Sequence, residues 1–99
     1  MPVRIHPTAD VSLDAIIGEG TSVWHQAHIR DGATIGEECI IGKGVYVGAD
    51  VSIGNRVKIQ NYVSVYEGLT IEDGVMVGPH EVVMPKSRIS VIEQQEADT

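Results

Sequence analysis

The hydrophobic positions of this chain follow a six-residue period. From residue 5 to residue 77, every sixth residue is isoleucine or valine, without an insertion. The thirteen positions are Ile5, Val11, Ile17, Val23, Ile29, Ile35, Ile41, Val47, Ile53, Ile59, Val65, Ile71 and Val77. Four residues after each of the first twelve stands a second small or apolar residue, such as Ala9, Cys39 or Val63. This period fits neither a helix nor a flat alternating strand. It predicts a parallel β-helix built from hexapeptides.

Three hexapeptides would form the three faces of a triangular prism, so one coil should hold eighteen residues. The thirteen repeats then give a little over four coils, about 4.8 Å apart if ordinary strand spacing holds. Glycine follows six of the aliphatic positions: Gly18, Gly36, Gly42, Gly48, Gly54 and Gly78. We interpret these glycines, and Asn55 beside Gly54, as corner residues that adopt positive φ.

The pattern is expected to end shortly after residue 80. Glu81 occupies a position that should be small or apolar, and Pro85 cannot donate a hydrogen bond to a strand ladder. We therefore expect one all-β domain with coils over residues 5–82. Residues 83–99 should form a short C-terminal cap and a frayed acidic tail.

Composition narrows the classes of function. The net charge is −7, with only seven lysines and arginines, so we expect no nucleic-acid partner. A local group of these cations could still bind a phosphorylated small molecule.

The single cysteine, Cys39, excludes an intrachain disulfide and lies on a small-residue position, where we expect it to be buried. No apolar run approaches the length of a membrane span, and the first residues resemble no signal peptide. We expect a cytoplasmic protein with no membrane partner.

The eighteen-residue coil predicts columns of side chains on adjacent coils. The columns that carry polar and aromatic residues are Gln26, Gly44, Tyr62 and His80; His28, Tyr46 and Ser64; Arg30, Gly48 and Tyr66; Asp31, Ala49 and Glu67; and His25, Lys43 and Asn61. These columns concentrate the candidate chemistry on one side of the prism.

Histidines are the first candidates for a site. His25 and His28 have an HxxH spacing, but zinc needs three or four ligands and one chain supplies no close third. We favour hydrogen bonding at an interface or to a substrate, although a trimer interface could supply the missing ligand. His80 follows Gly78-Pro79, where it is either a general base or a solvated surface residue.

Tyrosines mark a second candidate region. Tyr62 and Tyr66 lie in the run 60–68, which is rich in side chains that stack or form hydrogen bonds. This run is typical of a ligand surface or of a subunit interface, where tyrosine is also enriched. We expect Trp24 to pack at an interface rather than to hold a ligand.

Two segments carry a resemblance to a known family. Residues 24–30 (Trp-His-Gln-Ala-His-Ile-Arg) and 58–68 (Lys-Ile-Gln-Asn-Tyr-Val-Ser-Val-Tyr-Glu-Gly) resemble the nucleotide-sugar N-acetyltransferases of the left-handed β-helix superfamily. Ile71-Glu72-Asp73 and Gly78-Pro79 continue the resemblance, which covers most of residues 5–80. The left hand is taken from this resemblance, because parallel crossovers are otherwise right-handed.

The resemblance implies a homotrimer with active sites between subunits. Acetyl-CoA would be the co-substrate, and the acceptor would be an amino sugar carried on UDP or dTDP, as in lipopolysaccharide assembly; no metal is expected. The family's Asn-Asp element after Gly-Pro is absent, and His80 stands in that stretch. The site residues we assign are His80 and Asn61 as catalytic, Tyr62, Tyr66, Glu67, Gln60, His28 and Arg30 as substrate-binding, and Gly78 and Lys86 as CoA-binding.

Two alternatives stay open. The chain could be a non-catalytic trimeric β-helix, either a scaffold or a vestigial paralogue. It could also resemble the γ-class carbonic anhydrases, which share the fold and hold zinc between subunits; His25, His28 and His80 motivate this alternative, although their spacing differs from that family's pattern.

Overall fold

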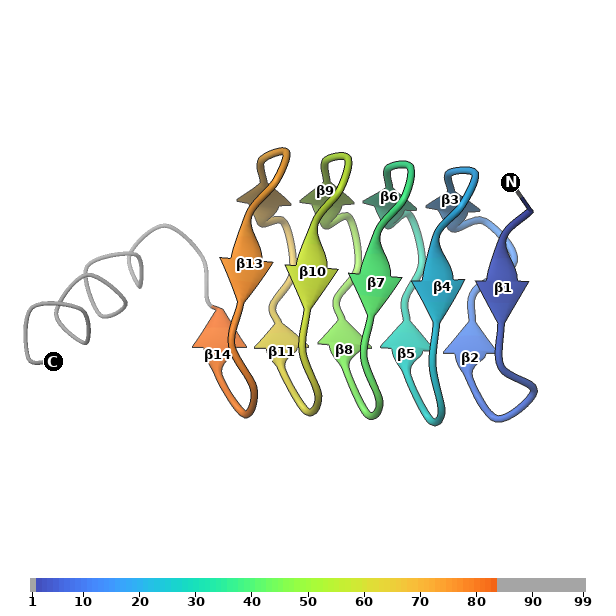
Figure 1. Cartoon of the computed structure of the whole chain (residues 1–99), viewed down its shortest axis with the longest axis horizontal. Coiled ribbons are helices and arrows are strands. Elements are labelled where there is room, and N and C mark those ends of the chain that lie inside the picture. The colour runs from blue at the N-terminus through green and yellow to red at the C-terminus, as the bar shows by residue number, and fades with distance from the viewer. Residues whose placement is uncertain (1, 84–99) are drawn as a thin grey trace, which may run out of the picture.

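The computed structural model describes residues 2–83 as a stack of short strands and turns (Figure 1). The strands are β1 (Arg4–Ile5), β2 (Asp10–Val11), β3 (Ile16–Ile17), β4 (Ser22–Val23), β5 (His28–Ile29), β6 (Thr34–Ile35), β7 (Ile40–Ile41), β8 (Tyr46–Val47), β9 (Ser52–Ile53), β10 (Lys58–Ile59), β11 (Ser64–Val65), β12 (Thr70–Ile71), β13 (Met76–Val77) and β14 (Val82–Val83). Over these residues there is no helix, and hence none that could cross a membrane.

The strands form three parallel sheets, one on each face of the prism. Sheet A contains β1, β4, β7, β10 and β13; sheet B contains β2, β5, β8, β11 and β14; sheet C contains β3, β6, β9 and β12. Every pair joins residues eighteen apart, as in the pairing of Ser22 with Ile40 and of Ile40 with Lys58. The predicted parallel β-helix of hexapeptide repeats, with a little over four coils, is confirmed, and its architecture is that of the left-handed class.

The core is a column of aliphatic side chains inside the prism. The second residue of each strand faces inward, and Ile29, Ile41 and Ile59 are at most 1% exposed. Most of the small-residue positions are buried between them, including Cys39, as predicted, whereas Val75 is exposed near the C-terminal end of the stack. Burying one such aliphatic side chain contributes about 1.5–3 kcal/mol. Packing of these side chains therefore stabilises the fold together with the backbone hydrogen bonds between coils, such as that from the His28 amide to the Val45 carbonyl at 2.8 Å.

The turns share one backbone conformation. From residue 20 to residue 80, every sixth residue has φ between 56° and 77°. Glycine fills this position at residues 20, 32, 44, 68 and 74, whereas Gln26, Glu38, Asp50, Arg56, Tyr62 and His80 fill the others. The left-handed conformation thus recurs at the same position of every turn from residue 20 to residue 80, although the residue type at that position varies.

The prediction for the other six glycines was wrong. None of Gly18, Gly36, Gly42, Gly48, Gly54 and Gly78 has positive φ. Most of them lie where the backbone of the next coil passes closely. A Cβ added to Gly18 would lie 2.6 Å from the carbonyl carbon of Gly36, and one on Gly36 would lie 2.6 Å from the carbonyl oxygen of Gly54. Close approach, rather than φ, requires glycine there.

Asn55 was also misassigned, because its φ is not positive. Its side-chain oxygen accepts a hydrogen bond from the Glu37 amide at 2.8 Å, and its own amide donates to Asp73 at 2.7 Å. Asn55 therefore connects three consecutive coils through the corner between sheets C and A.

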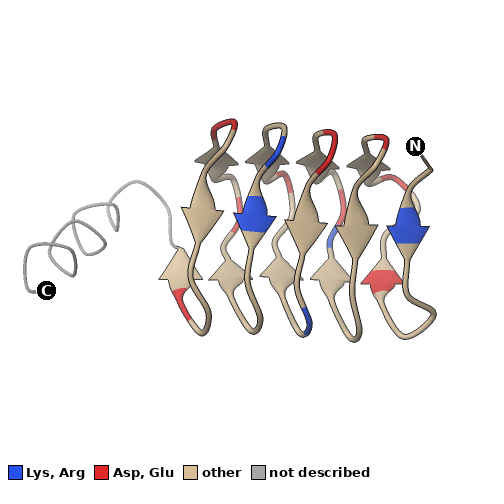
Figure 2. Cartoon of the chain, viewed as in Figure 1, with Lys and Arg blue, Asp and Glu red and all other residues tan. Residues whose placement is uncertain are grey.

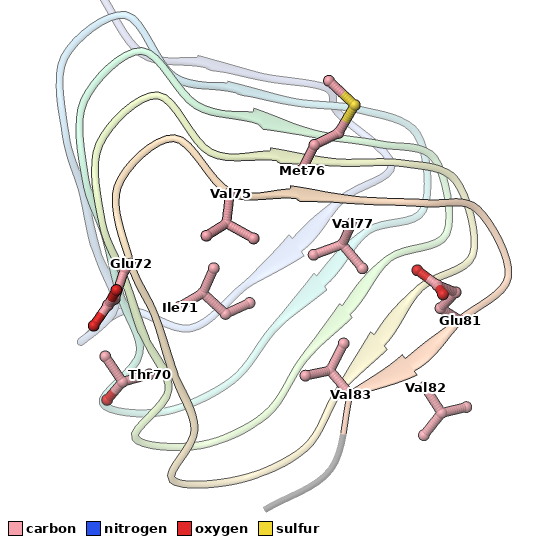
Figure 3. A pocket seen from close by; sticks show the side chains of 9 residues that line it. All are labelled: Thr70, Ile71, Glu72, Val75, Met76, Val77, Glu81, Val82 and Val83. Atoms are coloured by element: carbon pink, nitrogen blue, oxygen red, sulfur yellow. The ribbon is translucent and has the colours of Figure 1, made fainter. Parts of the chain in front are cut away.

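The coil continues through β14. Val82 pairs with Ser64 and Val83 with Val65, so the inward series extends one position past Val77. Glu81 turns its carboxylate back to the Gly78 amide at 2.9 Å. Side chains of β12, β13 and β14 line an apolar hollow of about 390 Å³ at this end (Figure 3). The expected cap, with Lys86, lies outside the described residues.

Candidate functional site

The first group of predicted site residues lies at the AB corner, the turns that follow the strands of sheet A (residues 6–8, 24–26, 42–44, 60–62 and 78–80). Here the rings of Tyr62 and His80 stack with centroids 5.2 Å apart and planes inclined by 18°. Both residues hold the positive φ of the coil, at 61° and 58°. The His80 amide donates to the carbonyl of Asn61 at 2.9 Å. The structure therefore brings Asn61, Tyr62 and His80 together; the column of Tyr62 and His80 predicted the contact between those two.

Hydrogen bonding leaves one end of the Asn61 side chain available. Its Oδ1 accepts from the Lys43 amide at 3.0 Å, whereas its Nδ2 donates to no described residue. Lys43 Nζ lies 5.9 Å from the centre of the Tyr62 ring, at cation–π range. This corner thus offers an amide donor and an exposed imidazole on a fixed backbone.

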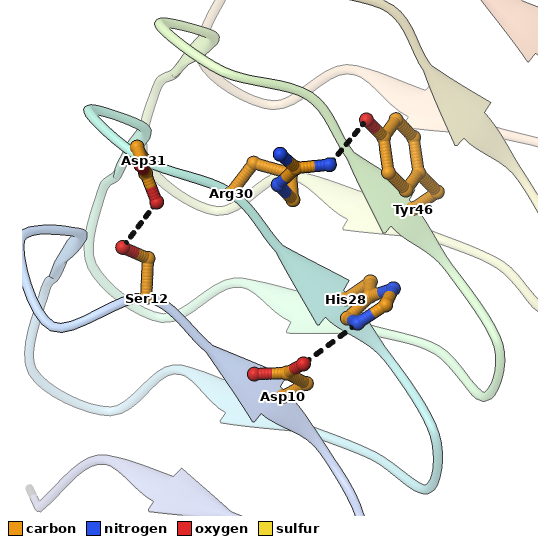
Figure 4. A network of polar contacts seen from close by, with 6 residues as sticks. All are labelled: Asp10, Ser12, His28, Arg30, Asp31 and Tyr46. Carbon is orange, nitrogen blue, oxygen red and sulfur yellow. Dashed lines mark hydrogen bonds and ion pairs between the residues drawn. The ribbon is translucent and has the colours of Figure 1, made fainter.

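The second group lies on the outer surface of sheet B (Figure 4). His28 on β5 shares a hydrogen bond of 2.8 Å between its Nε2 and Asp10 Oδ2 on β2. The His28 ring meets the Tyr46 ring edge to face at 6.4 Å, and Arg30 Nη1 donates to the Tyr46 hydroxyl at 3.4 Å. His28 and Arg30 line a hollow of about 280 Å³ with Asp10, whose carboxylate fixes the orientation of the imidazole.

Tyr66 and Glu67 lie farther along the same surface. They line a hollow of about 680 Å³ together with Tyr46 and Ser64. Tyr46 thus stands between the two hollows of sheet B. The predicted substrate residues His28, Arg30, Tyr66 and Glu67 are therefore spread along one face of the prism.

Sheet B separates the two groups. The AB corner enters this sheet, and Arg30, Tyr66 and Glu67 follow its strands at the opposite edge. A single chain does not gather them into one pocket. Gln60 and Asn61 instead line a hollow on the sheet A side, with Trp24 and two lysines. The Gly78 amide, expected at the CoA, already donates to Glu81.

Histidines do not gather into a metal site. The His25 ring lies 3.8 Å from His6 at the AB corner, whereas His28 is held by Asp10 on sheet B. Across residues 2–83, no three His, Cys, Asp or Glu side chains meet in a geometry for a metal. Partial burial, and then the neighbouring His25, lower the pKa of His6, which favours its neutral form. Its Nδ1 accepts the Thr8 amide at 3.1 Å.

Reasoning from the sequence missed Asp10 and the contact between Arg30 and Tyr46, whereas the column of His28, Tyr46 and Ser64 predicted that Tyr46 lies beside His28. Asp10 holds His28, and Tyr46 contacts both His28 and Arg30. The eighteen-residue offset between Asp10 and His28 was the available signal for the first contact. The contact between Arg30 and Tyr46 crosses the columns diagonally, so no offset of one coil predicts it.

Comparison with known proteins supports the fold and the resemblance. Residues 14–49 match the family described as bacterial transferase hexapeptide (six repeats). The structure of PerB from Caulobacter crescentus, in complex with CoA and GDP-perosamine, is 31% identical, with a TM-score of 0.61, over 82% of this chain and 48% of that one. No curated protein matches the chain.

A second solved structure is matched at lower identity. The acetyltransferase domain of PglB from Neisseria gonorrhoeae, in complex with acetyl coenzyme A, is 24% identical, with a TM-score of 0.34, over 78% of this chain and 55% of that one. The chain thus spans about half the length of the structures it matches. The predicted resemblance to hexapeptide-repeat acetyltransferases is confirmed.

Proposed function

We propose that this hexapeptide-repeat protein is an acetyl-CoA-dependent N-acetyltransferase that acts on an amino sugar linked to a nucleotide. The observation that carries the proposal is the likeness to PerB, whose structure holds CoA and GDP-perosamine. The run 58–68, with its amide and tyrosine side chains, lies on the same coils as the stacked Tyr62–His80 pair. These coils offer the groups that acetyl transfer to an amine requires.

The reaction needs little covalent help from the protein. The lone pair of the sugar amine attacks the carbonyl carbon of the thioester, and the carbon–sulfur bond then breaks. The amine loses a proton, and CoA leaves as the thiol. Orientation of the two substrates supplies much of the rate. Donors to the developing oxyanion and a proton acceptor near neutral pKa supply the rest.

We assign these roles to the AB corner. His80 accepts the amine proton, because its imidazole is exposed and its ring is held by Tyr62. Asn61 Nδ2 donates to the oxyanion, because Oδ1 alone is engaged by the Lys43 amide. Gly78 would face the coenzyme once Glu81 turns away from its amide.

The proposed assembly is a homotrimer with sites between subunits. The supporting observation is the separation of the two groups on either side of sheet B. In a trimer, Tyr66, Glu67, His28 and Arg30 of one subunit would face the AB corner of the next. The acceptor sugar would then lie between the two surfaces.

The direct test is thiol release from acetyl-CoA in the presence of UDP-, dTDP- and GDP-linked amino sugars, with the acetylated product identified by mass. His80→Ala should lower kcat by about 100-fold or more, since general-base catalysis typically contributes that much. Glu38→Ala, at the same turn position of another corner, is the matched control and should leave kcat unchanged. Absence of thiol release with every acceptor would refute the proposal.

A further inference from the structure

Charge is segregated on this prism. The outward residues of sheet A are Arg4, Ser22, Ile40, Lys58 and Met76. Neither these positions nor the AB corner contains an aspartate or glutamate, although the whole chain has a net charge of −7. Figure 2 shows β1 and β10 in blue on this face, while the red segments lie on other strands and turns. One face of an acidic protein therefore lacks the charge that would repel an anion.

A hollow of about 340 Å³ lies on this face, where sheet A meets the AB corner. Its lining includes Trp24, His25, Lys43, Lys58, Gln60 and Asn61, and no carboxylate. Within residues 2–83, neither lysine has an acidic partner at ion-pair distance. Its size is in the range of small-molecule sites. Two lysines without an acidic partner among residues 2–83 therefore line the same concave surface.

The lining combines two kinds of recognition. Ammonium groups form strong charge-assisted hydrogen bonds with phosphate oxygens. Trp24 is 48% exposed in the single chain and lines the hollow, so a planar base can reach its side chain. Base–aromatic stacking of this kind tolerates any base.

We propose that this hollow binds the nucleoside diphosphate part of a ligand, with Lys43 and Lys58 on the phosphates and Trp24 against the base. Lys43 enters the proposed acetyl transfer only through its backbone amide, and Lys58 and Trp24 have no role in it. The inference rests on the proposed function only for the identity of the ligand that carries the nucleoside diphosphate. CoA and a nucleotide sugar both carry one. The site itself depends on charge, shape and an exposed ring.

Isothermal titration of the full chain tests the site without turnover. ADP, UDP and CoA are the probes, and adenosine and pyrophosphate are the fragments. Lys43→Gln and Lys58→Gln should each weaken binding of the nucleotides and pyrophosphate by about tenfold, the effect of one charge-assisted hydrogen bond, and leave adenosine unchanged. Trp24→Ala should weaken ADP, UDP and adenosine by about tenfold and spare pyrophosphate.

Arg56→Gln is the matched control, because it removes one exposed positive charge from the corner between sheets C and A. An equal loss of affinity in Arg56→Gln would assign the effect to net charge and overturn the site. Absence of ADP, UDP and CoA binding to the wild-type chain would also overturn it. Circular dichroism of each variant confirms that the coils are intact.

The same variants show which ligand carries the nucleoside diphosphate, and they test the site separately from the acetyl transfer. A lysine effect on CoA alone identifies the coenzyme as the ligand, and an effect on UDP alone identifies the nucleotide sugar. Both results support the site. Nucleotide binding without thiol release would refute the acetyl transfer and leave the site standing. Thiol release with an unchanged KM for acetyl-CoA and for the nucleotide sugar in both lysine variants would refute the site and leave the acetyl transfer standing.

Discussion

Glycine meets two separate physical requirements in this chain, at two positions of the turn. One position needs positive φ, and Gly74 occupies it with no atom within 4 Å of an added Cβ. The other position needs space, and Gly36 occupies it against the backbone of Gly54. Substituted side chains should be accepted at the first position if they tolerate positive φ, and rejected at the second whatever their φ preference.

Gly36→Ala should therefore lower the free energy of unfolding by about 2–3 kcal/mol, as overpacking against fixed backbone does. Gly74→Asn should change it by less than about 0.5 kcal/mol, because asparagine tolerates the left-handed region. Urea denaturation of both variants measures the difference. Equal losses in the two variants would contradict the assignment of Gly36 to close approach.

Asp14 links stability to pH at another turn. Its carboxylate accepts the Ser12 hydroxyl at 2.8 Å and the Gly32 amide at 3.1 Å, and these bonds lower its pKa. Its stabilising contribution is present above the unfolded pKa of about 3.9 and is lost as pH falls through the lower folded pKa. Wild type should thus be more stable than Asp14→Asn at neutral pH, and the gap should narrow below pH about 4.

Urea midpoints of wild type and Asp14→Asn between neutral and strongly acidic pH measure this narrowing. Ser12→Ala gives the reciprocal test, because loss of its hydroxyl should raise the pKa of Asp14 toward its ordinary value, as followed by NMR titration. A gap that stays constant with pH would show that Asp14 acts through packing instead.

At the scale of the element, each strand divides its two residues between core and surface. In β7, Ile41 is fully buried, whereas its neighbour Ile40 is 41% exposed. The same side chain thus occurs in two environments one residue apart. Intrinsic strand propensity is the same for both residues. A difference in the free energy of unfolding between their substitutions therefore shows which of the two faces the core.

Ile41→Ala should lower the free energy of unfolding by about 2–5 kcal/mol, through lost burial and the cavity left behind. Ile40→Ala should lower it by less than about 1 kcal/mol. Chemical denaturation gives both values under one set of conditions. Similar losses would mean that the hexapeptide register in solution differs from the one described.

Much of this arrangement could be predicted from the sequence. The period fixed the inward positions and the eighteen-residue offset placed Tyr62 next to His80. The turn conformation could not be predicted, because Gln26, Arg56 and Tyr62 share no property that marks positive φ. The division of the site also escaped prediction: a column gives the position of its residues around the prism, but the columns alone do not show that sheet B lies between the AB corner and Arg30, Tyr66 and Glu67.

At the scale of the whole molecule, the proposed site depends on assembly. The AB corner and the far edge of sheet B lie on either side of one sheet, so a complete site would need a neighbouring chain. Sedimentation of the purified chain of 10.7 kDa should thus show a particle of three times that mass. A monomer at assay concentrations, still active in thiol release, would contradict the intersubunit site.

The common register of the three sheets also restricts how this molecule can change in length. Removing or duplicating eighteen residues, one full coil, leaves every column aligned, whereas a number that is not a multiple of eighteen shifts the later residues off their columns. Surface groups on one face can therefore move relative to each other along the axis only in steps of about 4.8 Å. A binding surface on one face of this protein can therefore be lengthened only by inserting whole coils.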